Sequence, residues 1–113
     1  RQHYYKSLGV MAMTELLDPP QYEKLVAGCR RIGLSDRDVH YYAEHITVDI
    51  GHADGWLNNV IVPIGKKHPA AMEEVYFGAA LRLQTCNDYY DGLLAALQSL
   101  DGSASSHSVP PSE

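Results

Sequence analysis

One segment constrains the fold of this chain more than any other: a helical pattern that runs without interruption from Ser35 to about Val62. Ser35 and Asp38 resemble a capping box, with Asp in place of Glu, so the helix should begin at this point. Apolar residues occur on most sides of the segment, which is typical of a central helix in a bundle. The chain must therefore surround this helix with other helices.

Three further helices are predicted from apolar residues that recur at three- and four-residue steps. Proline removes a backbone donor and disfavours helix in the preceding residue, so Asp18, Pro19 and Pro20 should separate the first two helices. Gly33 should cap the second helix, and the turn-rich segment 63–69 should precede the last. The predicted helices span residues 3–17, 20–32, 35–62 and 70–100. No segment alternates like a strand, so the fold class is all-α, with neighbouring helices packed roughly antiparallel.

A chain of 113 residues suits one small domain, which we place at residues 3–100. Residues 101–113 are polar and rich in Ser and Pro, and they are predicted to form a disordered tail. Arg1 leads directly into an apolar periodic segment without an initiator Met, so we expect the chain to begin inside a longer protein.

Charge and hydropathy exclude several functions. The net charge is −5 and basic residues occur only as small pairs, which argues against a nucleic-acid surface or a polybasic membrane anchor. No apolar run reaches the roughly 18 residues that a membrane span needs, so we expect a soluble, cytoplasmic protein. Cys29 and Cys86 lack CxxC spacing, and neither a disulfide framework nor a thiolate zinc site is indicated.

Three potential metal ligands, His45, Asp49 and His52, lie on one face of the long predicted helix. At about 100° per residue, their side chains fall within about 60° of one another. An ionised Asp between two imidazoles on such an apolar helix needs a partner. Two imidazoles and one carboxylate are associated with non-haem Fe(II), and the Asp49-x-x-His52 pair resembles those with which helical bundles hold two metal ions. The residues favour iron, and zinc or manganese would accept the same ligands.

Glu15 is a fourth candidate ligand, because it lies on the apolar stripe of the first helix, where an ionised carboxylate is costly unless paired or metal-bound. Three other residues are weaker candidates, either for contacts to the metal ligands or for substrate binding. Glu44 is one position off the face of the triad, and Trp56 extends that face. Arg82 lies in an apolar stretch, where it would bind a substrate carboxylate or form an internal ion pair.

The segment from Tyr41 to His52, YYAEHITVDIGH, resembles the last metal-binding helix of the haem-oxygenase-like di-iron oxidases and oxygenases. That helix carries the pattern H-x3-D-x2-H, which residues 45, 49 and 52 match position for position. Glu15 resembles the glutamate that an earlier helix of the family contributes upstream of the first histidine. The resemblance covers about residues 5–98, and it implies that this chain forms the C-terminal helices of a haem-oxygenase-like bundle.

The resemblance also implies a cofactor of two Fe(II) ions with O2 as cosubstrate. The implied substrate is small and amino-acid-like or fatty-acid-like, oxidised by N-oxygenation, oxidative decarboxylation or C–C cleavage. The family's site uses six ligands, of which Glu15, His45, Asp49 and His52 match the last four. A missing N-terminal half or a second chain would supply the other two, and we expect a homodimer. The alternative is a metal-free helical module of the same fold that binds a small molecule or a partner chain.

Overall fold

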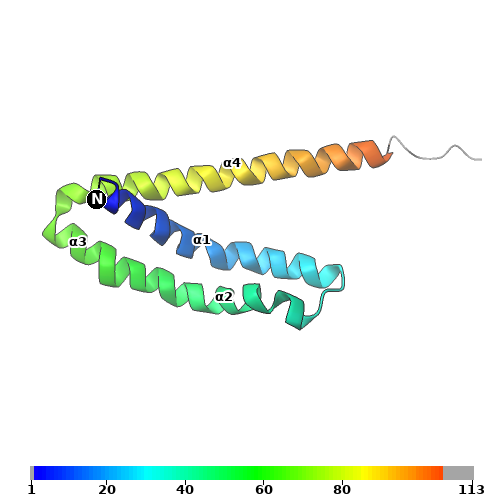
Figure 1. Cartoon of the computed structure of the whole chain (residues 1–113), viewed down its shortest axis with the longest axis horizontal. Coiled ribbons are helices and arrows are strands. Elements are labelled where there is room, and N and C mark those ends of the chain that lie inside the picture. Colours follow the sequence, from blue (N-terminus) through cyan, green and yellow to red (C-terminus); the bar gives the residue numbers. More distant parts are fainter. Residues whose placement is uncertain (1, 106–113) are drawn as a thin grey trace, which may run out of the picture. The chain divides into compact units, whose positions relative to one another are not determined.

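The computed structural model describes residues 2–105, and every regular element among them is helical, which confirms the predicted all-α class. The elements in chain order are α1 (Tyr4–Arg31), α2 (Asp36–Gly55), the π-helix η1 (Trp56–Ile61), α3 (Val62–Lys67), the 3-10 helix η2 (Pro69–Ala71) and α4 (Met72–Ser105), as shown in Figure 1. Contacts divide the chain into a unit Arg1–Arg82 and a unit Leu83–Glu113. The first unit contains all the predicted site residues, so it is the unit that concerns function.

The first two predicted helices form a single helix, α1, with Pro19 and Pro20 inside it. The predicted break at Asp18 is therefore wrong. The prolines cannot donate to the carbonyls of Glu15 and Leu16, which removes two helical hydrogen bonds. Packing outweighs this loss, because α1 lies along α2 and Pro19 is itself buried.

The turn between α1 and α2 has the two helix caps that were predicted, at Gly33 and at Ser35. Gly33 has φ +89° and donates to the carbonyl of Arg30 at 3.0 Å, and the next amide, of Leu34, donates to Cys29 at 3.0 Å, which together form a Schellman motif. Ser35 then caps α2: its hydroxyl accepts from the Asp38 amide, and the Asp38 carboxylate accepts from the Ser35 amide. The short connection places α2 antiparallel to α1 (Figure 1).

The long predicted helix continues past Val62, and residues 62–67 are helical where a connector was predicted. A π-helical turn precedes Pro63, and the amide of Val62 donates to the carbonyl of Leu57, five residues back. The wider turn moves away the carbonyl that the proline ring would meet in an α-helix. The chain breaks only at His68, before η2.

The last helix begins close to its predicted start and extends to Ser105, five residues beyond the boundary predicted at Leu100. No proline occurs before Pro110 to stop it. The rest of the predicted tail, residues 106–113, lies outside the described residues. None of the described helices is long and apolar enough to cross a membrane.

The start of α4 crosses α1 at two glycines. A Cβ at Gly9 would collide with the carbonyl oxygen of Val75, and a Cβ at Gly78 would collide with that of Lys6. Both glycines are buried, so the two backbones touch where no side chain intervenes. This crossing holds the first residues of α4 against the helix that carries Glu15.

The apolar core of the first unit is small. Its buried residues include Leu8, Val26, Val39, Ala71 and Val75. Large apolar side chains on the same helices are exposed, among them Met11, Leu16, Val48, Ile50 and Leu57. So much exposed apolar surface is typical of a unit that packs against further protein.

Candidate metal centre

Helices α1 and α2 bring three of the four predicted ligands together: Glu15, Asp49 and His52 each offer an atom within 4.8 Å of the others. The Nδ1 of His52 lies 3.1 Å from Oδ1 of Asp49 and 3.3 Å from Oε2 of Glu15. Because carboxylates accept, this nitrogen donates and its proton is shared between the two acids. Glu15, the fourth candidate ligand, therefore lies beside two of the three candidates on α2.

The antiparallel register of α1 and α2 explains which residues meet. Glu15 lies opposite His52, and two turns further along α1 the ring of Tyr22 lies 6.3 Å from the ring of His45. Asp18 falls between Glu15 and Tyr22 on the same face of α1, as Asp49 falls between His52 and His45 on α2. Asp18 therefore faces Asp49.

Asp49 is the buried centre of this arrangement. Only 2% of its surface is exposed, and its Oδ2 is buried with no hydrogen-bond partner among the described residues. A buried carboxylate oxygen without a partner is rare, because desolvation costs on the order of 1–3 kcal/mol or more for a charged group. The neighbouring groups include the acids Glu15 and Asp18, which cannot donate to Oδ2 while they are ionised.

The two acids that neighbour Asp49, Glu15 and Asp18, both have raised pKa values. Burial, followed by the hydrogen bond and charge of Asp49, raises the pKa of Glu15 above its ordinary 4.5, and the hydrogen bond and charge of His52 oppose this. Burial and then Asp49 also raise the pKa of Asp18 above its ordinary 3.8, while Arg82 and His45 act against the rise. The carboxylates of Glu15, Asp18 and Asp49 thus lie close together, with less positive charge nearby than their three negative charges.

His45 does not join the three-residue cluster in the described part of the chain. It lies one turn before Asp49, half-buried, with its ring 4.1 Å from that of Tyr41. Its Nδ1 lies 2.7 Å from the carbonyl oxygen of Tyr41, so Nδ1–H donates and Nε2 keeps its lone pair. A backbone carbonyl that orients one ring nitrogen is a common feature of metal-binding histidines.

Two of the weaker candidates, Glu44 and Trp56, differ in where they lie on the helices. Glu44 is exposed, and its Oε2 lies 3.7 Å from Nε2 of His40 on the same helix. Its position one residue off the ligand face turns it toward solvent. Trp56 is half-buried at the start of η1, one turn after His52.

Arg82 makes a hydrogen bond to the hydroxyl of Thr14 on α1. Its Nε donates to Oγ1 of Thr14 at 3.0 Å, and Thr14 Oγ1 donates to the carbonyl of Val10 at 2.9 Å. Thr14 is one turn before Asp18 on α1, which places the guanidinium beside that acid and explains its effect on the pKa of Asp18.

Sequence reasoning missed Asp18 and Tyr22. Asp18 was interpreted as the end of a helix, because two prolines follow it. The spacing Glu15-x-x-Asp18 would have placed both acids on one face of a continuous helix. Tyr22, whose pKa is raised by burial and by Asp18, continues that face by another turn.

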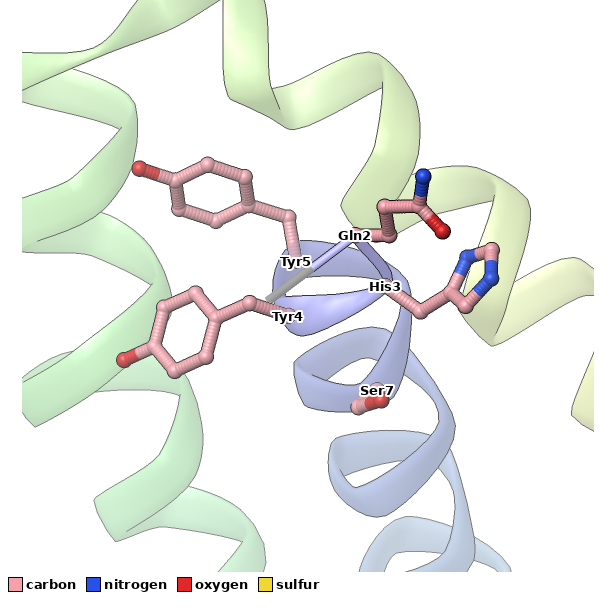
Figure 2. A pocket seen from close by; sticks show the side chains of 5 residues that line it. All are labelled: Gln2, His3, Tyr4, Tyr5 and Ser7. Carbon is pink, nitrogen blue, oxygen red and sulfur yellow. The ribbon is translucent and has the colours of Figure 1, made fainter.

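A hollow at the start of α1 lies outside this centre. It has a volume of about 920 Å³ and is lined by Gln2, His3, Tyr4, Tyr5 and Ser7. Figure 2 shows Tyr4 and Tyr5 pointing to one side and Gln2 and His3 to the other. No candidate ligand lines this hollow, so it is separate from the metal centre.

The donor set fits a divalent transition metal. Glu15, Asp49 and His52 supply two carboxylates and an imidazole, the ligand types found in Fe(II), Mn(II) and Zn(II) sites. The observation that supports the fit is the unpartnered, buried Oδ2 of Asp49, which a cation would satisfy. Cys29 and Cys86 lie outside this cluster, so soft thiolate ligation is not indicated.

The raised pKa values of Glu15 and Asp18 predict an unusual pH dependence. Each folded-state pKa lies above its ordinary value, so the folded chain binds protons more tightly than the unfolded chain. The free energy of unfolding should therefore fall as pH rises from about 4 through the raised pKa values. We expect the melting temperature of the metal-free chain to decline over that range, as measured by circular dichroism with a chelator present.

A Glu15→Gln, Asp18→Asn double variant is the control for this pH dependence, because it removes both acids. Its melting temperature should fall less, or should rise, over the same range. A steeper fall in the double variant than in the wild type would contradict the assignment.

The chain resembles proteins of known class. A family model described as iron-containing redox enzyme matches residues 1–86. The 4-chloro-allylglycine synthase of Streptantibioticus cattleyicolor is 30% identical over 88 residues, which are 78% of this chain and 34% of that protein. The chain thus spans about a third of the length of this curated relative. No solved structure matches the chain significantly.

Proposed function

This chain belongs to the iron-containing redox enzyme family, and on that premise we propose that it carries part of a non-haem di-iron centre of an O2-dependent oxygenase or oxidase. The observation that carries the proposal is the buried Asp49, whose Oδ2 has no hydrogen-bond partner within residues 2–105 although Glu15 and His52 converge on the same carboxylate. Protein interiors rarely keep such an oxygen without a cation or a donor.

Four residues of this chain would hold the iron. Glu15, Asp49 and His52 already converge, and His45 presents Nε2 because its Nδ1–H is engaged by the Tyr41 carbonyl. Bound Fe(II) would supply the electrons with which O2 is reduced. A metal bound at Nδ1 of His52 would take the place of the hydrogen that this atom now shares with two carboxylates, and the neutral ring would then carry its hydrogen on Nε2.

The substrate class is proposed from the relative. The name of 4-chloro-allylglycine synthase describes a product that is a modified amino acid. We infer that the substrate here is small and amino-acid-like, which takes preference over a fatty acid. From the family resemblance, the reaction would be an oxidative decarboxylation, an N-oxygenation or a C–C cleavage.

The centre is proposed to be completed by more protein than residues 2–105. Four ligands are fewer than two ions require, and 54% of the His52 side chain is exposed beside a buried Asp49. Exposed apolar residues on both helices, such as Leu16 and Val48, offer a surface to cover that opening. Upstream residues of a longer chain or a second polypeptide would supply the covering helices, and a homodimer is our preferred assembly.

An anaerobic Fe(II) titration tests the proposal. The His52→Ala and His45→Ala variants should each lose Fe(II) affinity by about 10-fold or more, because each removes one imidazole ligand. His68→Ala is the matched control, since His68 is an exposed residue between α3 and η2 and should bind no iron. Equal Fe(II) binding by the wild type and all three variants would overturn the proposal and favour a metal-free binding module.

A further inference from the structure

We propose that the C-terminal part of α4, residues 83–105, is a docking surface at which a second copy of this chain packs the same segment. The contact is an apolar seam in the unit Leu83–Glu113, formed by Leu83, Cys86, Tyr90, Leu93, Leu97 and Leu100. None of the candidate metal ligands belongs to this unit. The inference is therefore independent of the proposed iron centre, and it assigns the contact between copies to one helix face.

The seam has the spacing of a helix that packs along another helix. Its six residues follow one another at steps of three, four, three, four and three positions, which is the spacing of positions a and d in a heptad repeat. At about 100° per residue, all six stay within about 100° of one another around the helix. α4 runs from Met72 to Ser105 without a proline, so they lie on one continuous helix. A mean spacing of about 3.5 residues suits a partner helix at a shallow crossing angle.

The seam is exposed although it is apolar. Its large side chains retain between 40% and 66% of their surface, and of the six residues only Cys86 is buried. Every residue from 87 to 103 is exposed. A helix gains most of its stability from packing of its apolar face, because an isolated helix is marginal in water. This segment therefore needs a partner helix to cover the seam.

The charges around the seam fit a second copy of the same segment. Residues 83–105 contain no Lys or Arg, and their three acids are Asp88, Asp91 and Asp101. Asp88 and Asp91 lie more than about 120° around the helix from the middle of the seam. There Gln84 donates to Asp88 at 2.9 Å and Asn87 donates to Asp91 at 3.4 Å. Two copies can therefore join seam to seam with these like charges on their outer sides.

The area of the surface is sufficient for a specific pair. Tyr89 and Leu94, both exposed, border the seam and widen its apolar face. With these two residues, the seam offers on the order of 600 Å² of exposed side-chain surface in each copy, so a pair would bury roughly 1,200 Å² in total. That is the lower end of the range for stable, specific interfaces. The same patch serves both copies, as in a two-fold symmetric dimer.

Sedimentation equilibrium of the metal-free, 113-residue chain tests the inference. The wild type should be a dimer at micromolar concentration. Leu93→Glu and Leu97→Glu should each weaken the association by about 100-fold or more, because each variant places one charge per copy in an apolar contact. Ala95→Glu is the matched control: residue 95 is exposed on the opposite side of the helix, so the same added charge should leave the association unchanged. Circular dichroism confirms that each variant is folded, as expected for substitutions of exposed residues.

Three outcomes would overturn the inference. The first is a wild-type chain that stays monomeric at these concentrations. The second is a dimer that neither Leu93→Glu nor Leu97→Glu weakens, because its contact would then lie elsewhere. The third is equal weakening by Ala95→Glu, which would show a general effect of charge. None of these results depends on Fe(II) binding by the chain, so each would leave the proposed function standing.

Discussion

Replacing Asp49 with Asn is expected to abolish Fe(II) binding and, at the same time, to raise the melting temperature of the metal-free chain. The loss of affinity should exceed about 100-fold, because the carboxylate lies at the point where the other ligands converge. The gain in stability has a separate origin. The asparagine side chain would still accept from His52 through its oxygen, and its amide, in the place of Oδ2, would donate to the neighbouring carboxylates of Glu15 and Asp18.

The stability gain should amount to about 1–3 kcal/mol, the cost of leaving a buried polar group unsatisfied. For a domain of this size that corresponds to a rise of roughly 4–8 °C per kcal/mol. Isothermal titration with Fe(II) under anaerobic conditions measures the first effect, and thermal unfolding with a chelator measures the second.

Asp54→Asn is the matched control for this experiment. Asp54 is on the same helix, exposed, and accepts only from Asn58, at 2.8 Å, among the contacts that the structure describes. Its replacement should leave metal affinity unchanged and alter stability by less than about 0.5 kcal/mol. If Asp49→Asn instead destabilised the metal-free chain, the buried carboxylate would be satisfied by the protein itself, and the argument for a cation would fail.

Gly9→Ala and Gly78→Ala are expected to be strongly destabilising, because each new methyl group would collide with backbone of the neighbouring helix. The carbonyl oxygens of Val75 and Lys6 are part of helical hydrogen-bond ladders and cannot move aside as a side chain can. The helices must separate, which should cost at least about 1–3 kcal/mol for each variant. Thermal or urea unfolding of the metal-free chain measures this loss.

Gly28→Ala and Gly51→Ala are the matched controls, since both glycines are helical and a Cβ there meets nothing within 4 Å. In these open positions alanine should stabilise the helix by about 0.5–1 kcal/mol. The two pairs of variants therefore have opposite expected signs for the same chemical change. Similar effects in all four would show that α1 and the start of α4 do not touch as described.

The two predictions connect stability to function. The crossing at Gly9 and Gly78 holds the start of α4, and with it Arg82, next to Thr14 and Asp18. A variant that separates the helices should therefore weaken metal binding as well as lower stability. The Asp49 carboxylate is expected to affect the two properties in opposite directions: its Oδ2, unpartnered among the described residues, would lower the stability of the metal-free chain and would favour binding of a cation.

Much of this protein was predictable from local sequence. Gly33 and Ser35 have the capping roles that were expected, because a cap depends on a few neighbouring residues. His45, Asp49 and His52 lie along α2 at the expected spacing, since helical periodicity alone determines which side chains share a face. The family followed from the same spacing together with Glu15, and the match over residues 1–86 confirmed it.

The tertiary structure decided the rest. Pro19 and Pro20 are helical because packing of α1 against α2 outweighs two lost hydrogen bonds, a balance that local propensity does not contain. The partner of Asp18 depends on the register between two helices, which no sequence spacing specifies. The sequence thus determined which ligands a helix presents. Only the packing of α1 on α2 determined that Glu15 meets His52, that Asp18 faces Asp49, and that one buried oxygen of Asp49 has no partner among the described residues.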